Sequence, residues 1–214
     1  MAYIRDQKLL IGSWLLCALV CLLAILAWGM DYNWSVLPLN AYVLFPVLGL
    51  LAFSMMWTHY IIGTAREVAG IDESATKSYY HYTGWAVLIL ICLHPGLLIY
   101  QLFADGAGLP PLSYERYVGP GLGWITLLGS ASLLVFLAFE LHRYFDKKSW
   151  WHYVVDASDF AMLAIVYHAL RLGSSLQTGW YRYIWWFYAL TLSAVLVRKY
   201  SMRLKAKPKA NPTG

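Results

Sequence analysis

Long apolar segments recur along the 214-residue chain, and shorter polar segments separate them. Six of the apolar segments reach the length of about 20 residues that an α-helix needs to cross a bilayer. Their approximate bounds are 9–29, 39–62, 82–104, 119–141, 153–173 and 181–201. The pattern therefore predicts an all-α integral membrane protein built as a six-transmembrane-helix bundle.

The connections between these segments are short, which leaves little chain for a second domain. The longest predicted connections are 64–81 and 105–118, and the Gly and Pro residues of the second are typical of an exposed loop. No repeated sequence unit is evident, so we expect residues 1–214 to form a single domain. The first apolar segment, from Leu9 to Trp28, is too long for the apolar part of a signal peptide, and we expect a retained helix.

Composition and charge agree with a membrane location, because 60% of the residues are hydrophobic and only 13% are charged. All but three of the 16 Lys and Arg residues fall on one side of the predicted membrane, and the exceptions are Arg116, Arg171 and Arg182. By the positive-inside rule, both termini are expected in the cytoplasm. The basic tail 202–214 then suits contact with anionic lipid, and no nucleic-acid partner is expected. A multi-pass protein of a bacterial inner membrane is the predicted location.

Two histidines lie deep within predicted spans. The third and fifth predicted helices run outward from the cytoplasm, and His94 and His168 come about 12 and 15 residues into them, at similar depth in the outer half of the membrane. An imidazole at this depth needs a partner, because water cannot solvate it there. Two neutral imidazoles that face each other can be the axial ligands of one haem iron, so the pair predicts a haem site between the helices. A hydrogen bond across helices is the alternative.

A second pair of histidines lies near the cytoplasmic starts of the same two helices. His81 and His152 could hold a second, inner haem; otherwise they are interfacial residues and the protein holds one haem. The remaining histidines, His59 and His142, fall at cytoplasmic helix ends, where hydrogen-bonded or interfacial side chains are typical. The sequence predicts one haem and leaves the second open.

Two stretches resemble the ferric-reductase-like transmembrane family, namely TGWAVLILICLH at 83–94 and WHYVVDASDFAMLAIVYHALRLG at 151–173. The family includes the haem-binding membrane cores of ferric reductases and NADPH oxidases and the haem subunit of a bacterial methionine sulfoxide reductase system. The resemblance implies that His94 and His168 hold a b-type haem near the outer face. It also implies an inner haem, but the family's first histidine on the fifth helix is replaced here by Val155, which cannot ligate iron.

Three charged residues extend the predicted site. Arg171 follows His168 by three residues, and its guanidinium suits a haem propionate, with snorkelling to outer headgroups as the alternative. Asp156 lies four residues after His152 and is expected to accept a hydrogen bond from it, while Asp159 is expected to handle protons. Alternatively, both carboxylates complement the dipole at the start of the fifth helix.

Together these features predict a membrane cytochrome b that transfers electrons to an outer-side acceptor. No GxGxxG motif or segment of domain size is present for a flavin or nicotinamide cofactor, so we expect an electron-transfer subunit of a partner-dependent oxidoreductase. The expected donor is a cytoplasmic flavin reductase with FAD or a membrane quinol, and the expected acceptor is an outer redox protein, ferric iron or oxygen. The alternative is a proton- or cation-coupled transporter that uses His152, Asp156 and Asp159.

Overall fold

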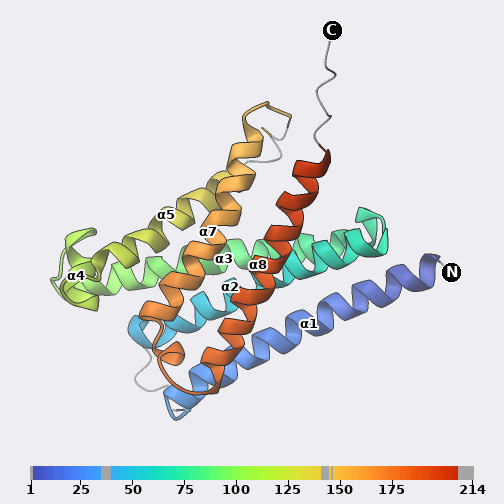
Figure 1. Cartoon of the computed structure of the whole chain (residues 1–214). Coiled ribbons are helices and arrows are strands. Elements are labelled where there is room, and N and C mark those ends of the chain that lie inside the picture. The colour runs from blue at the N-terminus through green and yellow to red at the C-terminus, as the bar shows by residue number, and fades with distance from the viewer. Residues whose placement is uncertain (1, 35–39, 141–144, 146, 207–214) are drawn as a thin grey trace, which may run out of the picture.

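The chain folds into helices joined by short connections (Figure 1), as a computed structural model shows for residues 2–34, 40–140, 145 and 147–206. The α-helices are α1 (Ala2–Asp31), α2 (Ala41–Ala69), α3 (Lys77–Ala104), α4 (Leu112–Val118), α5 (Gly123–Phe139), α7 (Trp151–Leu172) and α8 (Trp180–Ala206). Two short 3₁₀ helices, η1 (Glu73–Thr76) and η2 (Ser174–Leu176), lie in the connections. The described part of the chain is all-α, as predicted.

Every predicted apolar segment coincides with a helix, and all of these helices except α5 extend past the predicted bounds into polar residues at one end or both. The predicted connection 64–81 is wrong, because α2 continues to Ala69 and α3 begins at Lys77. Polar residues extend a helix readily, since its backbone hydrogen bonds do not depend on side-chain hydrophobicity. Local signals end it instead: Gly70 adopts the left-handed conformation, with φ of 60°, that closes the last turn of α2.

Two further differences concern the predicted loops. The external connection 105–118 contains a helix, α4, that the apolar pattern did not indicate because it is only 7 residues long. The last helix continues to Ala206, so the first residues of the predicted tail 202–214 are helical, and residues 207–214 lie outside the described residues, as does His142. Arg203 therefore extends from a helix, which gives it a fixed position beside α7.

Four helical segments are long and apolar enough to span a membrane. They are Tyr3–Asp31, Ala41–Ala69, Glu73–Ala104 and Trp151–Leu172. The apolar helix α5 has only 17 residues, and α8 is rich in tryptophan, tyrosine and basic residues that lower its hydropathy. The fold is thus that of a multi-pass membrane protein with at least four candidate spans among the described residues.

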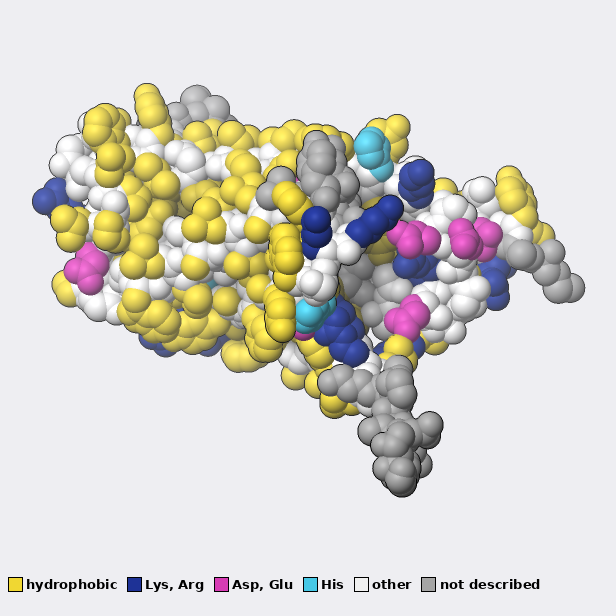
Figure 2. Space-filling view, turned by 90° about the horizontal axis from the view of Figure 1, so that it is seen from above, with side chains coloured by type: hydrophobic (Ala, Val, Ile, Leu, Met, Phe, Trp, Pro, Cys, Tyr) yellow, Lys and Arg dark blue, Asp and Glu magenta, His cyan; other side chains and the backbone are white. Residues whose placement is uncertain are grey.

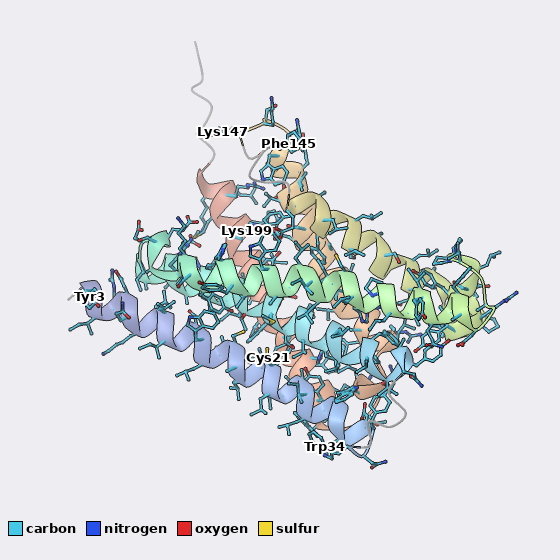
Figure 3. The ribbon with its side chains drawn as sticks, turned by 180° about the vertical axis from the view of Figure 1, so that it is seen from behind. Tyr3, Cys21, Trp34, Phe145, Lys147 and Lys199 are labelled. Atoms are coloured by element: carbon cyan, nitrogen blue, oxygen red, sulfur yellow. The ribbon has the colours of Figure 1, made fainter. Side chains whose placement is uncertain are left out.

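The helices form two groups that meet at one end of the molecule and diverge toward the other. Figures 1 and 3 show α1, α2 and α3 running together, while α7 and α8 cross them steeply and end away from them. The start of α1 and the end of α8 lie at the divergent end, and α4 lies at the opposite end. The largest buried apolar cluster joins the two groups, with Phe53 and Trp57 of α2 packed against Trp185 and Tyr188 of α8.

The surface has the distribution expected of a protein in lipid. Figure 2 shows hydrophobic side chains over much of the visible face, with charged and histidine side chains gathered toward the divergent end. Large apolar side chains such as Leu19, Ile89 and Leu134 are more than half exposed within helices. Such exposure is unfavourable in water and favourable against lipid, which agrees with the candidate spans.

Candidate functional site

A cavity of about 270 Å³ lies among the helices. Side chains of α2, α3, α5, α7 and α8 form its walls, and Tyr114 and Tyr117 of α4 also line it. Most of the lining is apolar. Both His94 and His168 line this cavity, so the structure brings together the two deep histidines that the sequence pairs.

The ring of His94 is fixed from behind by the main chain of α2. Its Nδ1 lies 2.6 Å from the carbonyl oxygen of Phe45, and its ring packs on the Phe45 ring with centroids 5.3 Å apart. A carbonyl oxygen only accepts, so Nδ1 carries the proton and donates it. The other nitrogen, Nε2, then holds a free lone pair, which is the form of imidazole that ligates metals.

His168 is held in the same way by α5. Its Nδ1 donates to the carbonyl oxygen of Ile125 over 2.8 Å, which again leaves the Nε2 lone pair free. The two histidines thus have the same tautomer, both donate to a main-chain carbonyl, and both line the same cavity. A pair of neutral imidazoles in this form is suited to ligating a single iron from two sides.

Each imidazole also lies against a glycine on the facing helix. A Cβ at Gly49 would lie 2.7 Å from Cε1 of His94, and a Cβ at Gly129 would lie 2.8 Å from Cε1 of His168. Both distances are too short for real carbon contacts. In both pairs the glycine follows the carbonyl residue by four positions, one helical turn after Phe45 or Ile125.

The two glycines and the two carbonyls are features of the candidate site that the sequence did not predict. The helix pairs α2–α3 and α5–α7 build the same arrangement, although no sequence repeat is evident between them. Small residues within apolar spans are a general signal of close helix approach, and that signal could have singled out Gly49 and Gly129. It could not have identified which ring lies against each glycine.

Two hydroxyl groups in the cavity have no hydrogen-bond partner in the described part of the chain. Thr126 and Ser175 line the cavity and are 7% and 6% exposed, and their side-chain oxygens are unpaired. Buried hydroxyls are normally satisfied, so both sites favour a ligand that brings hydrogen-bond acceptors. The predicted partner Arg171 is exposed and does not line the cavity.

His81 and His152 are not brought together at this cavity. Both are exposed, and neither lines it. His81 lies in an open groove between the starts of α1 and α3, together with Asp6. His152 donates from Nδ1 to the Ser149 carbonyl oxygen over 2.6 Å. The two helices that carry this pair diverge toward this end of the molecule, so equal depth along them does not produce proximity (Figure 1).

His59 fits the interhelical hydrogen bond that the sequence left as an option. Its Nε2 lies 2.7 Å from the hydroxyl oxygen of Thr83 on α3, and its ring packs on Tyr79 and Tyr80. The ring is only partly exposed. His59 therefore joins α2 to α3, and it needs no ligand to satisfy that nitrogen.

Asp156 and Asp159 pair with residues of α8, and within the described part of the chain neither forms a hydrogen bond with His152. Asp159 is 2% exposed and accepts from Lys199, labelled in Figure 3, over 2.6 Å and from Tyr200 over 2.8 Å. Asp156 accepts two bonds from Arg203, of 2.7 and 3.0 Å. The expected bond from His152 to Asp156 is thus replaced by a long-range ion pair. These contacts attach α8 to α7.

Asparagine at position 159 should destabilise the protein more than asparagine at position 156. The Asp159 carboxylate is buried, and its replacement leaves Lys199 without its partner, which should lower the free energy of unfolding by about 1–3 kcal/mol. The Asp156–Arg203 pair is more exposed and should contribute about 0–1 kcal/mol. Thermal unfolding in detergent, followed by tryptophan fluorescence, measures both. Asp31→Asn, at an exposed position, is the control. Equal shifts in unfolding temperature for all three variants would show that the contacts of Asp159 and Asp156 with α8 do not stabilise the protein.

The donor set fits a haem better than a bare metal ion. Among the described residues, no group of three or more His, Cys, Asp or Glu side chains could hold a metal. Two imidazoles alone are too few for a typical structural or catalytic metal site. They are the right number for an iron whose other four ligands come from a macrocycle, and the apolar walls and unpaired hydroxyls suit its ring and its propionates.

Comparisons with models of protein families, with curated proteins and with solved structures found no match to this chain. Support for a function therefore comes from the geometry of the cavity and its two histidines.

Proposed function

We propose that this chain is a membrane cytochrome b that holds one b-type haem between His94 and His168 and passes electrons to an acceptor on the outer side of the membrane. The main support is the matched pair of rings. Both line one apolar cavity, and both donate Nδ1–H to a main-chain carbonyl, which leaves each Nε2 available to iron. The interhelical hydrogen bonds account for Nδ1 of each ring, and a shared iron would account for Nε2.

The proposal includes a bundle of six transmembrane helices, with α5 and α8 completing the four candidate spans and both termini in the cytoplasm of a bacterium. Two observations support it. The two helices pack against candidate spans, since His168 of α7 bonds α5 and Lys199 of α8 bonds Asp159 of α7. Most basic residues lie in segments near the divergent end, where the positive-inside rule places the cytoplasm.

When bound, the haem would supply an iron that changes between ferric and ferrous states. The protein's own residues would set how it does so. His94 and His168 would both ligate the iron, and two protein ligands favour electron transfer over oxygen binding. The apolar walls would exclude water, and the unpaired hydroxyls of Thr126 and Ser175 would be available to donate hydrogen bonds to the propionates. Because these donors are neutral, the propionates would keep their negative charge, which would stabilise the ferric form.

One haem per chain is proposed in preference to two. The exposure of His81 and His152, their separate surroundings and the replacement of the family's ligand by Val155 support this choice. The inner half of the bundle is filled by side chains such as Trp57 and Tyr188, which are 3% and 1% exposed. We therefore place the protein's single redox centre in the outer half of the membrane.

The proposed role is that of an electron-transfer subunit similar to the ferric-reductase-like membrane cores. A cytoplasmic flavin reductase or a membrane quinol would be the donor, and an outer redox protein or ferric iron would be the acceptor. The transporter alternative finds no support in the contacts, because Asp156 and Asp159 are paired with Arg203 and Lys199. A proton relay would need carboxylates free to change charge.

The purified protein is expected to show a Soret band and, after reduction, the α and β bands of a six-coordinate b-type haem. A pyridine haemochrome assay should give about one haem per chain. The protein should be expressed with added haem precursor, because a shortage of haem in the cells would otherwise also leave the cavity empty. A colourless protein under these conditions would contradict the proposal, and two haems per chain would contradict the single-centre part of it.

A further inference from the structure

If the protein holds a single haem in the outer half of the membrane, each electron from the cytoplasm must cross the inner half without a second haem. We propose that four aromatic side chains, Trp185, Phe53, Tyr188 and Trp57, form the electron-entry path between that inner half and the haem cavity. This group is named the aromatic stack. The proposal rests on the proposed function, because the path has a purpose only if a haem occupies the cavity.

The aromatic stack begins in the wall of the cavity. Phe53 of α2 and Trp185 of α8 both line it, and their rings are stacked, with centroids 4.4 Å apart and planes 21° from parallel. Both rings also contact Tyr188, at 6.3 and 6.2 Å. The first two rings would thus stand between the haem and the rest of the stack.

The stack then continues away from the cavity along α2 and α8. The ring centroids of Tyr188 and Trp57 are 4.5 Å apart. Trp57 follows Phe53 by four residues and so lies about 6 Å further along α2, toward the divergent end. Trp57 is fixed by a bond of 2.9 Å from its Nε1 to the hydroxyl oxygen of Thr191 on α8. All four side chains are at most 3% exposed, so their positions are set by packing.

The stack ends where a polar network begins. Tyr60 lies one turn beyond Trp57 on α2, and its hydroxyl donates to Asp159 over 3.0 Å. Asp159 is also bound to Tyr200 and Lys199, and the side chain of Lys199 is 38% exposed. Tyr60 also packs against the buried cluster that contains the stack, so packed and hydrogen-bonded side chains lead from the cavity to the surface near the divergent end.

Contacting rings favour electron transfer for a simple reason. The rate of electron tunnelling falls steeply with the distance between donor and acceptor groups. An electron is delocalised over the whole width of an aromatic ring, so a row of rings leaves shorter distances to tunnel across than a row of aliphatic side chains. The stack only conducts: each electron that leaves a reduced flavin at the inner face converts one ferric haem to ferrous, and the flavin's proton remains at that face. No stack residue is left oxidised or reduced.

Photoinduced electron injection tests the stack directly. A ruthenium bipyridine photoreductant would be attached to Ala194→Cys, an exposed position on α8 one turn beyond Thr191, after Cys17, Cys21 and Cys92 are replaced by alanine. A laser flash then gives the rate of haem reduction. This rate is independent of any natural donor or acceptor.

Paired substitutions separate conduction from packing. Tyr188→Phe keeps the ring and removes only a hydroxyl that has no hydrogen-bond partner among the described residues, whereas Tyr188→Leu removes the ring. Trp57→Phe and Trp57→Leu both lose the bond to Thr191 and differ in the ring alone. Each leucine variant should reduce the haem at least an order of magnitude more slowly than its phenylalanine partner, with haem content and midpoint potential unchanged. Trp14→Leu, on α1 and away from the stack, should leave the rate unchanged.

The outcomes distinguish the two proposals. Equal rates in the leucine and phenylalanine variants, with haem bound normally, would overturn the aromatic stack and leave the cytochrome intact. A protein that binds no haem would overturn the proposed function, and the stack with it.

Discussion

Alanine in place of either His94 or His168 is expected to abolish stable haem binding. Each substitution removes one axial ligand and leaves the buried carbonyl oxygen of Phe45 or Ile125 without its side-chain donor. Haem content after purification should fall to background, and any haem retained should have the spectrum of a five-coordinate iron. Absorption spectra and the pyridine haemochrome assay measure both quantities.

Histidines outside the cavity provide the matched control. His81→Ala and His152→Ala make the same chemical change at exposed positions on the same two helices, and both should keep the wild-type haem content and spectrum. If His94→Ala and His168→Ala also kept them, the ligand assignment would be wrong. Loss of haem in His81→Ala alone would instead indicate that an inner haem is present.

The second large effect is expected at the two glycines behind the imidazoles. Gly49→Ala places a methyl group 2.7 Å from His94 Cε1, and Gly129→Ala places one 2.8 Å from His168 Cε1. Cε1 is bonded to Nε2, so moving it displaces the ligating atom. Overpacking of this kind costs about 1–3 kcal/mol, which corresponds to roughly ten- to hundredfold weaker haem binding. Haem titration of the apoprotein measures this affinity.

Another glycine on the same helix as His94 tests whether the effect is local. A Cβ at Gly96 meets nothing within 4 Å among the described residues, so Gly96→Ala should leave haem affinity unchanged. Alanine is also the better helix former, and Gly96→Ala should not lower thermal stability. Similar haem affinities for Gly49→Ala, Gly129→Ala and Gly96→Ala would show that the close approach to the rings has no effect on ligation.

The helices and the deep histidine pair could be predicted because both depend on local properties. Hydrophobicity along the chain indicates where a helix runs, and counting residues from its start gives the depth of His94 and His168. The same counting predicted that His81 and His152 lie at a similar depth near the cytoplasmic side of the membrane. The structure leaves both residues exposed on helices that diverge toward that end, and sequence spacing carries no information about the angle between helices.

The partners of the site residues could not be predicted, since they come from distant parts of the chain. Gly129 and the carbonyl of Ile125 act on His168 only because α5 packs on α7. Asp156 was expected to bind His152, four residues away, but Arg203 from the end of α8 reaches it instead. A guanidinium with two bonds to a carboxylate outcompetes a single imidazole donor.

The acceptors behind both imidazoles are main-chain oxygens, and this affects how the protein can be engineered. A side-chain acceptor can be deleted by one codon change, whereas the carbonyls of Phe45 and Ile125 persist whatever residue occupies those positions. Libraries that randomise the apolar walls, to tune the redox potential or admit a synthetic porphyrin, should therefore retain correctly oriented ligands as long as the two glycines are kept. The main-chain groups that orient the two imidazoles are thus separate from the side chains that form the cavity walls.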